Sequence, residues 1–257
     1  MSSPLISCIC VTRNRVHLLK RVIDCFNVQT YSARELVIVI ENDDQASIDF
    51  LKGDNINEKI KVIVVERSAT KKLGFLRNTG IQNASGEYVC QWDDDDWYHA
   101  RRLEHQFSYI TSSGKDGSVL TRWLMFDSKN KTASISPLRE WEGSIVVKKE
   151  TVLSIGYQNT EKLEDTPVVE MLRDKNHLCP INYTPQYYIY NFHGNNTWDY
   201  NHFKNFFNHS IALPPSIVLE IQKIMEEYDA VKGSAVLDNL SKEISKLSKP
   251  WYLKIFG

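Results

Sequence analysis

Residues 86–97 read GEYVCQWDDDDW, so an apolar stretch of strand length runs directly into four consecutive aspartates, Asp93–Asp96. Four adjacent carboxylates repel one another unless a cation lies among them. Hard divalent cations prefer carboxylate oxygens and often join them to the phosphates of a substrate. The stretch therefore predicts a buried strand that ends at a cation-binding turn. A solvated acidic turn or a helix cap is the simpler alternative.

Three further apolar runs of strand length precede this one, at residues 5–11, 35–40 and 60–65. Segments with helical character lie between these runs and after the aspartates, at residues 18–26, 47–52, 73–83 and 98–110. Strands that alternate with helices predict an α/β fold with a doubly wound, mostly parallel sheet. Ligands of such sheets bind beyond the carboxyl ends of the strands, where the aspartates and two other polar turns, TRNR (12–15) and ENDD (41–44), fall.

After about residue 117 the pattern becomes mixed. Strands are expected at residues 119–126, 132–138, 141–148 and 187–192, a helix at 164–175, and helices again from residue 216. The sequence contains neither an internal repeat nor a clear flexible linker. We therefore expect one domain over residues 1–212, in two halves (1–117 and 118–212), followed by a helical extension at 213–257.

Composition narrows the function classes. The 257 residues carry 31 Lys and Arg against 32 Asp and Glu, a formal net charge of −1. The hydrophobic share of 42% is ordinary for a globular protein and excludes a disordered chain. Balanced charge argues against a nucleic-acid binder, which is usually basic. The sequence lacks a P-loop and a Gly-x-Gly-x-x-Gly turn, which disfavours P-loop nucleotidases and dinucleotide-dependent oxidoreductases.

The cysteines and the apolar segments bear on the compartment. The five cysteines are an odd number and none form Cys-x-x-Cys, so buried free thiols are favoured over disulfides or metal ligands. The N-terminal apolar run is too short for a signal peptide, and no segment approaches the roughly 20 apolar residues of a membrane span. These features predict a cytoplasmic protein.

Four segments in order carry a family resemblance: PLISCICVTRNR (4–15), ELVIVIEND (35–43), KLGFLRNTG (72–80) and GEYVCQWDDDD (86–96). Each resembles a motif of the family 2 glycosyltransferases, strongly over residues 4–110 and more weakly to about residue 200. The resemblance implies the GT-A fold, a Rossmann-like, mostly parallel sheet flanked by helices. Residues 1–117 would form its nucleotide-binding half and residues 118–212 a mixed acceptor half.

The resemblance also implies an activity. The expected enzyme is an inverting, metal-dependent transferase of the hexosyltransferase class. It would move a sugar from a nucleotide-sugar donor, expected to be a UDP-sugar, to a glycan or lipid-linked saccharide acceptor in bacterial surface polysaccharide synthesis. The expected cofactor is Mn²⁺ or Mg²⁺, and no nucleic-acid partner is expected.

The same resemblance assigns the metal site. The family's Asp-x-Asp (DXD) motif holds the metal against the donor diphosphate, and Asp93 and Asp95 occupy its positions. Asp95 is the expected direct ligand, and Asp93 or Asp94 would contact the ribose. His193 lies in a late loop that resembles one whose histidine approaches the diphosphate or metal in the family, and it is a third candidate ligand.

Other positions match the family's donor contacts. Thr12 and Arg13 follow the first strand, where the family contacts the nucleobase. The next family contact is an aspartate that ends the second strand, but Glu41 stands there. This departure leaves the nucleobase open, and Asp43 is an alternative contact. Arg77 matches a family arginine near the base or phosphates, whereas a plain surface helix charge is the simpler interpretation.

An inverting transferase needs a carboxylate that deprotonates the acceptor hydroxyl. By resemblance, this base comes from a late Glu-Asp pair that opens a helix, and Glu164-Asp165 is similar to it. We expect Asp165 to be the base, with Glu164 as a supporting or exchanged alternative. N-terminal helix capping is the simpler but less favoured alternative for the pair. Trp141–Ser144 either lines the acceptor side or is structural.

Two rival functions and two roles for the tail stay open. A nucleotidyltransferase would use a similar acidic metal site, but it would want a glycine-rich phosphate loop where TRNR stands. A non-catalytic sugar-nucleotide binding module is disfavoured because both a metal cluster and a candidate base are present. Leu237, Leu240, Ile244 and Leu247 share one helical face near lysines and the aromatic residues after 250. This face would either pack on the body or a second subunit, which is favoured, or rest on the inner face of the plasma membrane.

Overall fold

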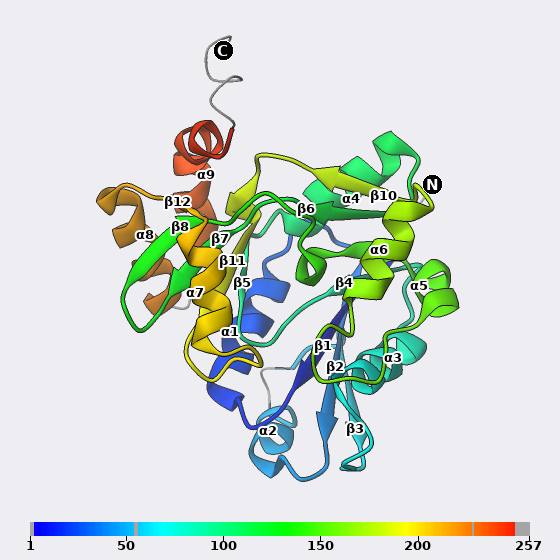
Figure 1. Ribbon diagram of the computed structural model, residues 1–257. Helices are drawn as coiled ribbons and strands as arrows, with labels where there is room; N and C mark the ends of the chain where they lie inside the picture. Colours follow the sequence, from blue (N-terminus) through cyan, green and yellow to red (C-terminus); the bar gives the residue numbers. More distant parts are fainter. Residues whose placement is uncertain (1–2, 54–55, 228, 250–257) are drawn as a thin grey trace.

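The computed structural model describes residues 3–53, 56–227 and 229–249, and two sheets form its centre (Figure 1). The larger sheet has the strand order β10-β6-β9-β4-β1-β2-β3. Its strands are β1 (Ile6–Thr12), β2 (Arg34–Glu41), β3 (Ile60–Val65), β4 (Tyr88–Gln91), β6 (Gly117–Leu120), β9 (Val146–Lys148) and β10 (Leu178–Ile181). The smaller sheet has the order β12-β8-β7-β11-β5. Its strands are β5 (Trp97–Tyr98), β7 (Leu124–Asp127), β8 (Thr132–Ile135), β11 (Tyr188–Phe192) and β12 (Ile211–Ala212).

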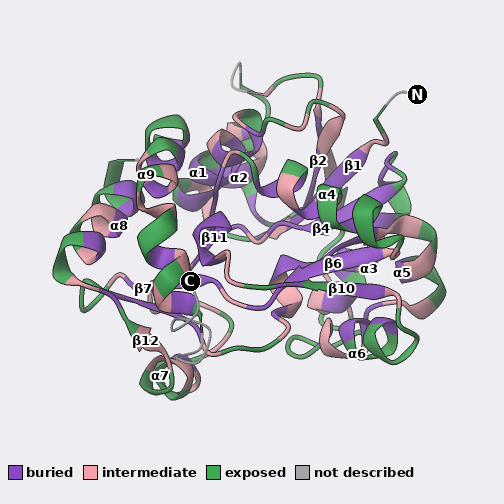
Figure 2. Cartoon of the chain, turned by 90° about the horizontal axis from the view of Figure 1, so that it is seen from above, coloured by how far each residue is buried: buried purple, intermediate pink, exposed green. Residues whose placement is uncertain are grey.

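Helices surround the sheets, with buried strands inside and exposed helix faces outside (Figure 2). The α-helices are α1 (Val16–Asn27), α2 (Gln45–Phe50), α3 (Leu73–Asn83), α4 (Arg102–Ser113), α5 (Lys149–Ile155), α6 (Thr166–Asp174), α7 (Tyr200–Asn208), α8 (Pro215–Glu227) and α9 (Ala230–Ser248). Two short 3₁₀ helices are η1 (Glu142–Ser144) and η2 (Pro185–Tyr187). The larger sheet is parallel apart from β9, which runs antiparallel to β4 and β6.

Strand β1 lies in the middle of the larger sheet, between β2 and β4. Its pairing is parallel on both sides, with Cys8 opposite Leu36 and Cys90. Every β1 residue except Val11 is buried, which explains why the run is continuously apolar instead of alternating. Because neighbouring parallel strands end at the same edge, the polar turns after β1, β2 and β4 meet there.

The aspartate turn connects the two sheets. Strand β4 in the larger sheet ends at Gln91, and β5 begins the smaller sheet at Trp97. Strand β5 pairs antiparallel with β11, so Ile189 lies opposite Trp97. Trp92 and Trp97 are both fully buried, and they anchor the two ends of the turn. Both tryptophans belong to the same hydrophobic core, so the turn is fixed at its two ends.

Several expected boundaries were wrong. Residues 98–110 do not form one helix, because Trp97 and Tyr98 are recruited into the smaller sheet and α4 starts only at Arg102. The expected strand at 119–126 is two strands, β6 and β7, in different sheets. Residues 141–148 form η1 and the short β9 instead of one strand. A buried apolar run does not reveal where a chain leaves one sheet for another.

The C-terminal helices share the main core. Ile217 and Ile221 of α8 and Leu237 and Ile244 of α9 are all buried with residues of both sheets. Helix α9 contacts α1 and η2. The apolar face of the tail helix thus packs on the body, as favoured. The proposed domain boundary at 212 stays a prediction, and so do the oligomer and membrane contacts; the aromatic residues after 249 lie outside the described residues.

Two further expectations concerned the state of the cysteines and the presence of membrane-spanning helices. All five cysteines are free, and all but Cys179 are buried. None of the described helices is long and apolar enough to cross a bilayer.

Candidate functional site

A cavity of ≈ 530 Å³ opens at the carboxyl-end edge of the larger sheet. Its walls come from the turns after β1, β2 and β4, from the loop before α6, and from the smaller sheet. Nine of the eleven sequence-predicted site residues line it: Thr12, Arg13, Glu41, Arg77, Asp93, Asp94, Asp95, Glu164 and Asp165. His193 is not among the lining residues but contacts one of them, Asp95. Asp43 is outside the lining and contacts Arg13.

The four aspartates do not form a solvated turn. Asp94, Asp95 and Asp96 are 4%, 8% and 1% exposed. Asp93 and Asp95 contact different partners, because β4 ends at Gln91 and the alternation of an extended strand does not continue through the turn.

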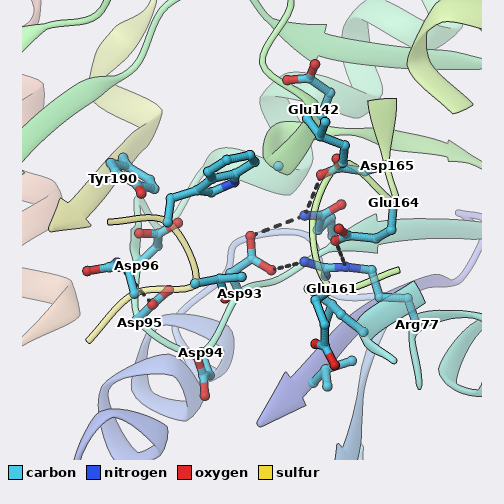
Figure 3. Close-up of a pocket in the computed structure, with 18 of the residues that line it drawn as sticks. Arg77, Asp93, Asp94, Asp95, Asp96, Glu142, Glu161, Glu164, Asp165 and Tyr190 are labelled. Atoms are coloured by element: carbon cyan, nitrogen blue, oxygen red, sulfur yellow. Dashed lines mark hydrogen bonds and ion pairs between the residues drawn. The ribbon is translucent and has the colours of Figure 1, made fainter. Parts of the chain in front are cut away.

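Asp93 belongs to a charge chain that crosses the cavity floor (Figure 3). Arg77 Nη2 donates to Asp93 Oδ1 at 2.8 Å, and Arg77 Nε donates to Glu164 Oε1 at 2.9 Å. Gln91 Nε2 lies 3.2 Å from Asp93 Oδ2 and 3.4 Å from Asp165 Oδ2. Arg77 is buried in α3, so it is not the surface helix charge of the simpler interpretation. These contacts join the aspartate turn to the start of α6.

Asp95 has a separate set of partners on the other side of the turn. Its Oδ2 atom lies 3.2 Å from His193 Nε2, and it accepts from Asn196 Nδ2 at 3.2 Å and Arg15 Nη1 at 3.1 Å. Burial alone would raise the pKa of Asp95, but the hydrogen bond with His193 and the charge of Arg15 hold that pKa below its ordinary value. Asp95 is therefore held as a carboxylate.

The negative charge of Asp94 is less well compensated than that of Asp95. It accepts from Thr12 Oγ1 at 2.7 Å and from Arg15 Nη1 at 2.8 Å. Burial and the neighbouring charge of Asp95 outweigh these contacts and raise the pKa of Asp94 from 3.8 to about 6. The charged form of Asp94 therefore costs folding free energy at neutral pH.

Asp96 anchors the turn to the smaller sheet. It accepts a short hydrogen bond from Tyr188 Oη and a 2.9 Å bond from the backbone N–H of Asn191. Burial and the charge of Asp95 raise the pKa of Asp96 well above its ordinary value. Asp96 therefore links the turn to the smaller sheet. Its contacts are those of a structural residue and not those of a metal ligand or a helix cap.

The turn after β2 forms the far end of the cavity. Glu41 Oε2 accepts from Arg67 Nη1 at 2.5 Å and lies 3.4 Å from Arg13 Nε. Its other oxygen, Oε1, is buried and has no hydrogen-bond partner among the described residues. Arg13 Nη2 also donates to the more exposed Asp43 at 2.8 Å. Glu41 lines the cavity, whereas Asp43 does not.

Asp165 stands at the N-terminus of α6 and makes no side-chain capping bond, so capping does not account for it. Burial raises its pKa; the charge of Arg77 opposes this and that of Asp93 adds to it. Glu164 also has a raised pKa, first because of burial, and is held by Arg77. Of the two, Glu164 forms an ion pair with Arg77, whereas Asp165 contacts the neutral side chain of Gln91.

A metal site of three protein ligands is not formed. Among residues 3–53, 56–227 and 229–249, no three His, Cys, Asp or Glu side chains converge to hold an ion. Asp93, which was expected to bind the metal together with Asp95 and His193, is instead held by Arg77. Asp95 Oδ2 and His193 Nε2, however, lie 3.2 Å apart, which is close to the ~3 Å between adjacent donors on an octahedral ion. These two residues fit an ion that takes its other ligands from a phosphate group and water.

Other cavity residues carried no clear signal in the sequence. Gln91 and Arg67 were not singled out, because a strand glutamine and a loop arginine are common. Tyr190 of β11, Trp123 just before β7 and Trp141 just before η1 also line the cavity, and the rings of Trp123 and Trp141 stack with centroids 4.3 Å apart. Of these three, only Trp141 lies in a segment that the sequence pointed to, residues 141–144. Their convergence depends on the pairing of strands far apart in sequence, so no local pattern reveals it.

Comparisons with known proteins give a consistent result. The model of the family described as "Glycosyl transferase family 2" matches residues 7–166. An uncharacterized glycosyltransferase of Rickettsia felis is 27% identical over 190 residues, which are 72% of this chain and 28% of that protein. The amylovoran biosynthesis glycosyltransferase AmsB of Erwinia amylovora is 34% identical over 112 residues, 42% of this chain and 36% of AmsB. The chain thus spans about a third of the length of these relatives.

Solved structures share the fold. TarS of S. aureus, residues 1–349 in complex with UDP-GlcNAc, has a TM-score of 0.59 at 16% identity and covers 95% of this chain and 72% of its own. The mannosyltransferase PcManGT of Pyrobaculum calidifontis, in complex with GDP-Man and Mn²⁺, has a TM-score of 0.57 at 14% identity and covers 94% and 76%. At these identities the likeness shows the fold alone, and it confirms the expected GT-A type of α/β fold.

Proposed function

The chain belongs to glycosyl transferase family 2, and from that premise we propose that it is a metal-dependent, inverting glycosyltransferase. It would transfer a sugar from a nucleotide-sugar donor, such as a UDP-sugar, to a hydroxyl group of a glycan or lipid-linked saccharide. The relative AmsB is named for amylovoran biosynthesis, and this supports a role in bacterial surface polysaccharide synthesis.

One observation carries the proposal. A carboxylate free to accept a proton, Asp165, and a carboxylate paired with an imidazole, Asp95 with His193, belong to the same ≈ 530 Å³ cavity region (Figure 3). Displacement at an anomeric carbon needs a proton acceptor on the side of the attacking hydroxyl and positive charge on the side of the leaving group. The two groups would supply these two needs.

At the leaving-group side, Asp95 and His193 would hold Mn²⁺ or Mg²⁺ together with the donor diphosphate. When bound, such an ion stabilises the negative charge that grows on the departing diphosphate. Arg77 would keep Asp93 in place, where its second oxygen, Oδ2, could accept from a donor hydroxyl. Thr12, Arg13 and Glu41, which line the cavity together, would form the nucleobase end.

At the acceptor side, Asp165 would take the proton of the acceptor hydroxyl as that oxygen bonds to the anomeric carbon. The bond between the anomeric carbon and the diphosphate breaks in the same step, so the configuration inverts. Burial of Asp165 raises its pKa, which makes its carboxylate a better proton acceptor than an exposed aspartate. Gln91 would orient Asp165 through the 3.4 Å contact.

A thermal-shift screen of UDP-, GDP- and dTDP-sugars with and without Mn²⁺ tests the proposal. We expect one donor to raise the melting temperature only when Mn²⁺ is present, because ligands that bind the folded state stabilise it. The same donor should slowly release its nucleoside diphosphate. Binding without any release, even with an acceptor mixture, would favour the non-catalytic module. Pyrophosphate release from a nucleoside triphosphate would favour a nucleotidyltransferase.

A further inference from the structure

Arg15 joins three parts of the site. Its Nη1 atom donates to Asp94 Oδ1 at 2.8 Å and to Asp95 Oδ2 at 3.1 Å, and its Nη2 atom donates to the backbone carbonyl of Asn195 at 2.5 Å. The guanidinium therefore links the turn after β1, the aspartate turn and the loop after β11. It also lines the cavity, so a bound anion can reach it.

The oxygen that Arg15 contacts is the one proposed to bind the metal. Asp95 Oδ2 already faces Arg15 Nη1 and His193 Nε2. A guanidinium and a divalent cation on one carboxylate oxygen repel each other strongly in a buried site. Arg15 therefore competes with a metal ion for Asp95.

Two other arginines that line the cavity are paired with other carboxylates. Arg77 is bound to Asp93 and Glu164. Arg13 points to Asp43 and Glu41 at the nucleobase end.

We propose that Arg15 makes metal binding conditional on the donor. Before the donor arrives, the guanidinium neutralises Asp94 and Asp95 and disfavours a lone divalent ion. A diphosphate offers the planar guanidinium phosphate oxygens, which it binds in bidentate fashion. The side chain then turns from Asp95 to the phosphates, and the ion is bound by Asp95, His193 and the diphosphate together. This inference rests on the proposed function, whose metal site it deepens.

The test measures Mn²⁺ binding from the electron paramagnetic resonance signal of free Mn²⁺. It compares the wild type, Arg15→Gln and Lys20→Gln, each with Mn²⁺ alone and with Mn²⁺ plus UDP or GDP, whichever diphosphate the thermal-shift screen selects. Lys20→Gln removes one positive charge from α1, where Lys20 is exposed and pairs with Asp24 outside the cavity. We expect Arg15→Gln to bind Mn²⁺ alone at least about tenfold more tightly than the wild type, and Lys20→Gln to change the affinity little.

A conservative variant separates charge from packing. Arg15→Lys keeps a cation near Asp95 and should retain weak binding of Mn²⁺ alone, close to the wild type. If Arg15→Gln melts below the assay temperature, Arg15→Met, which keeps the apolar stem, carries the same comparison. If Arg15 were only structural, its substitution would not increase the affinity for Mn²⁺, because loss of a structural contact weakens ligand binding.

Two results overturn the inference and are distinguishable. Equal affinities of the wild type and Arg15→Gln for Mn²⁺ alone would show that Arg15 does not compete, while the proposed transferase would stand. Absence of Mn²⁺ binding to every variant, even with the diphosphate, would overturn the metal assignment of the proposed function and the inference with it.

Discussion

The two ends of the cavity are built in different ways. At the end proposed for the donor, side chains stand on short turns at the ends of β1, β2 and β4, and their charges are paired, as Arg13 is with Glu41 and Arg15 with Asp95. At the end proposed for the acceptor, Asp165 stands just before α6 and lines the same cavity as the aromatic residues Trp123 and Tyr190. The order of the parallel strands therefore positions the side chains at the first end. Packing between segments far apart in sequence positions those at the second. Variants at the two ends should separate binding of the donor from its consumption.

The largest effect is expected for Asp95→Asn at the donor end. Loss of the carboxylate removes a proposed metal ligand, and stabilisation of the leaving group by an ion is worth several kcal/mol, or about a thousandfold in rate. Mn²⁺-dependent donor binding in the thermal-shift assay should vanish together with activity. Asp24→Asn, on the exposed side of α1, is the control and should behave as the wild type. Normal turnover by Asp95→Asn would show that Asp95 is not the metal ligand.

Asp94→Asn should stabilise the fold. Since the folded-state pKa of Asp94 is about 6 against 3.8 for an ordinary aspartate, the folded protein binds the proton more tightly within this pH window. The contribution that protonated Asp94 makes to the free energy of unfolding is therefore lost as the pH rises from about 4 to 6. Asparagine cannot ionise, so the variant should be more stable at pH 7 by roughly 1–3 kcal/mol.

Thermal or urea unfolding at several pH values measures this change. The gain of Asp94→Asn should shrink towards pH 4 and below, where the wild-type carboxyl is protonated. An equal melting temperature of the two proteins at pH 7 would contradict the assigned pKa. The expected loss of activity in the same variant would identify Asp94 as a residue kept for function at a cost in stability.

Gln91→Leu tests how the two ends are connected. The Gln91 hydrogen bond lowers the pKa of Asp165, although burial keeps that pKa raised overall. The base must be unprotonated, so activity should fall as the pH drops through the pKa of Asp165. Removal of the hydrogen bond should move this acid limb of the rate profile to higher pH by a fraction of a unit to about one unit. An unmoved limb in the variant would mean that another group governs it.

Glu41→Asp should have the smallest effect. The change restores the family residue at the end of β2 but withdraws the carboxylate from Arg67. We expect the KM for the donor to change roughly threefold to tenfold, as for one altered hydrogen bond, with kcat nearly constant. A change in kcat alone would place Glu41 in the chemical step instead of in nucleobase binding. A panel of UDP-, GDP- and dTDP-sugars would show whether the preferred nucleobase changes.

Local patterns predicted which residues gather at one edge of the larger sheet, the end proposed for the donor. The buried strands at residues 5–11 and 35–40 and the acidic run after β4 place Thr12, Glu41 and Asp95 at one edge, because parallel strands end together. The side-chain directions within the turn were not predictable. Arg77 attracts Asp93 from α3, and this contact depends on how a helix packs.

The end proposed for the acceptor was predicted less well, because it depends on strand pairing between segments far apart in sequence. Tyr98 was expected to begin a helix, yet pairing with β11 makes it part of a strand together with Trp97. Residues 119–126 read as one strand because their apolar run does not mark the change of sheet. Non-local pairing decides both cases. Asp165 was expected from the Glu-Asp pair and the helix after it, but its contact with Gln91 was not.

The most direct test of the central claim is a paired measurement on Asp165→Asn: donor affinity with Mn²⁺, and the rate of nucleoside diphosphate release with acceptor. We predict donor affinity within about twofold of the wild type and a rate lower by about 10²–10⁴, as for loss of a general base. Glu164→Gln, measured beside it, should retain more activity. A rate for Asp165→Asn close to the wild type would contradict the account, and so would donor binding that is lost together with the rate.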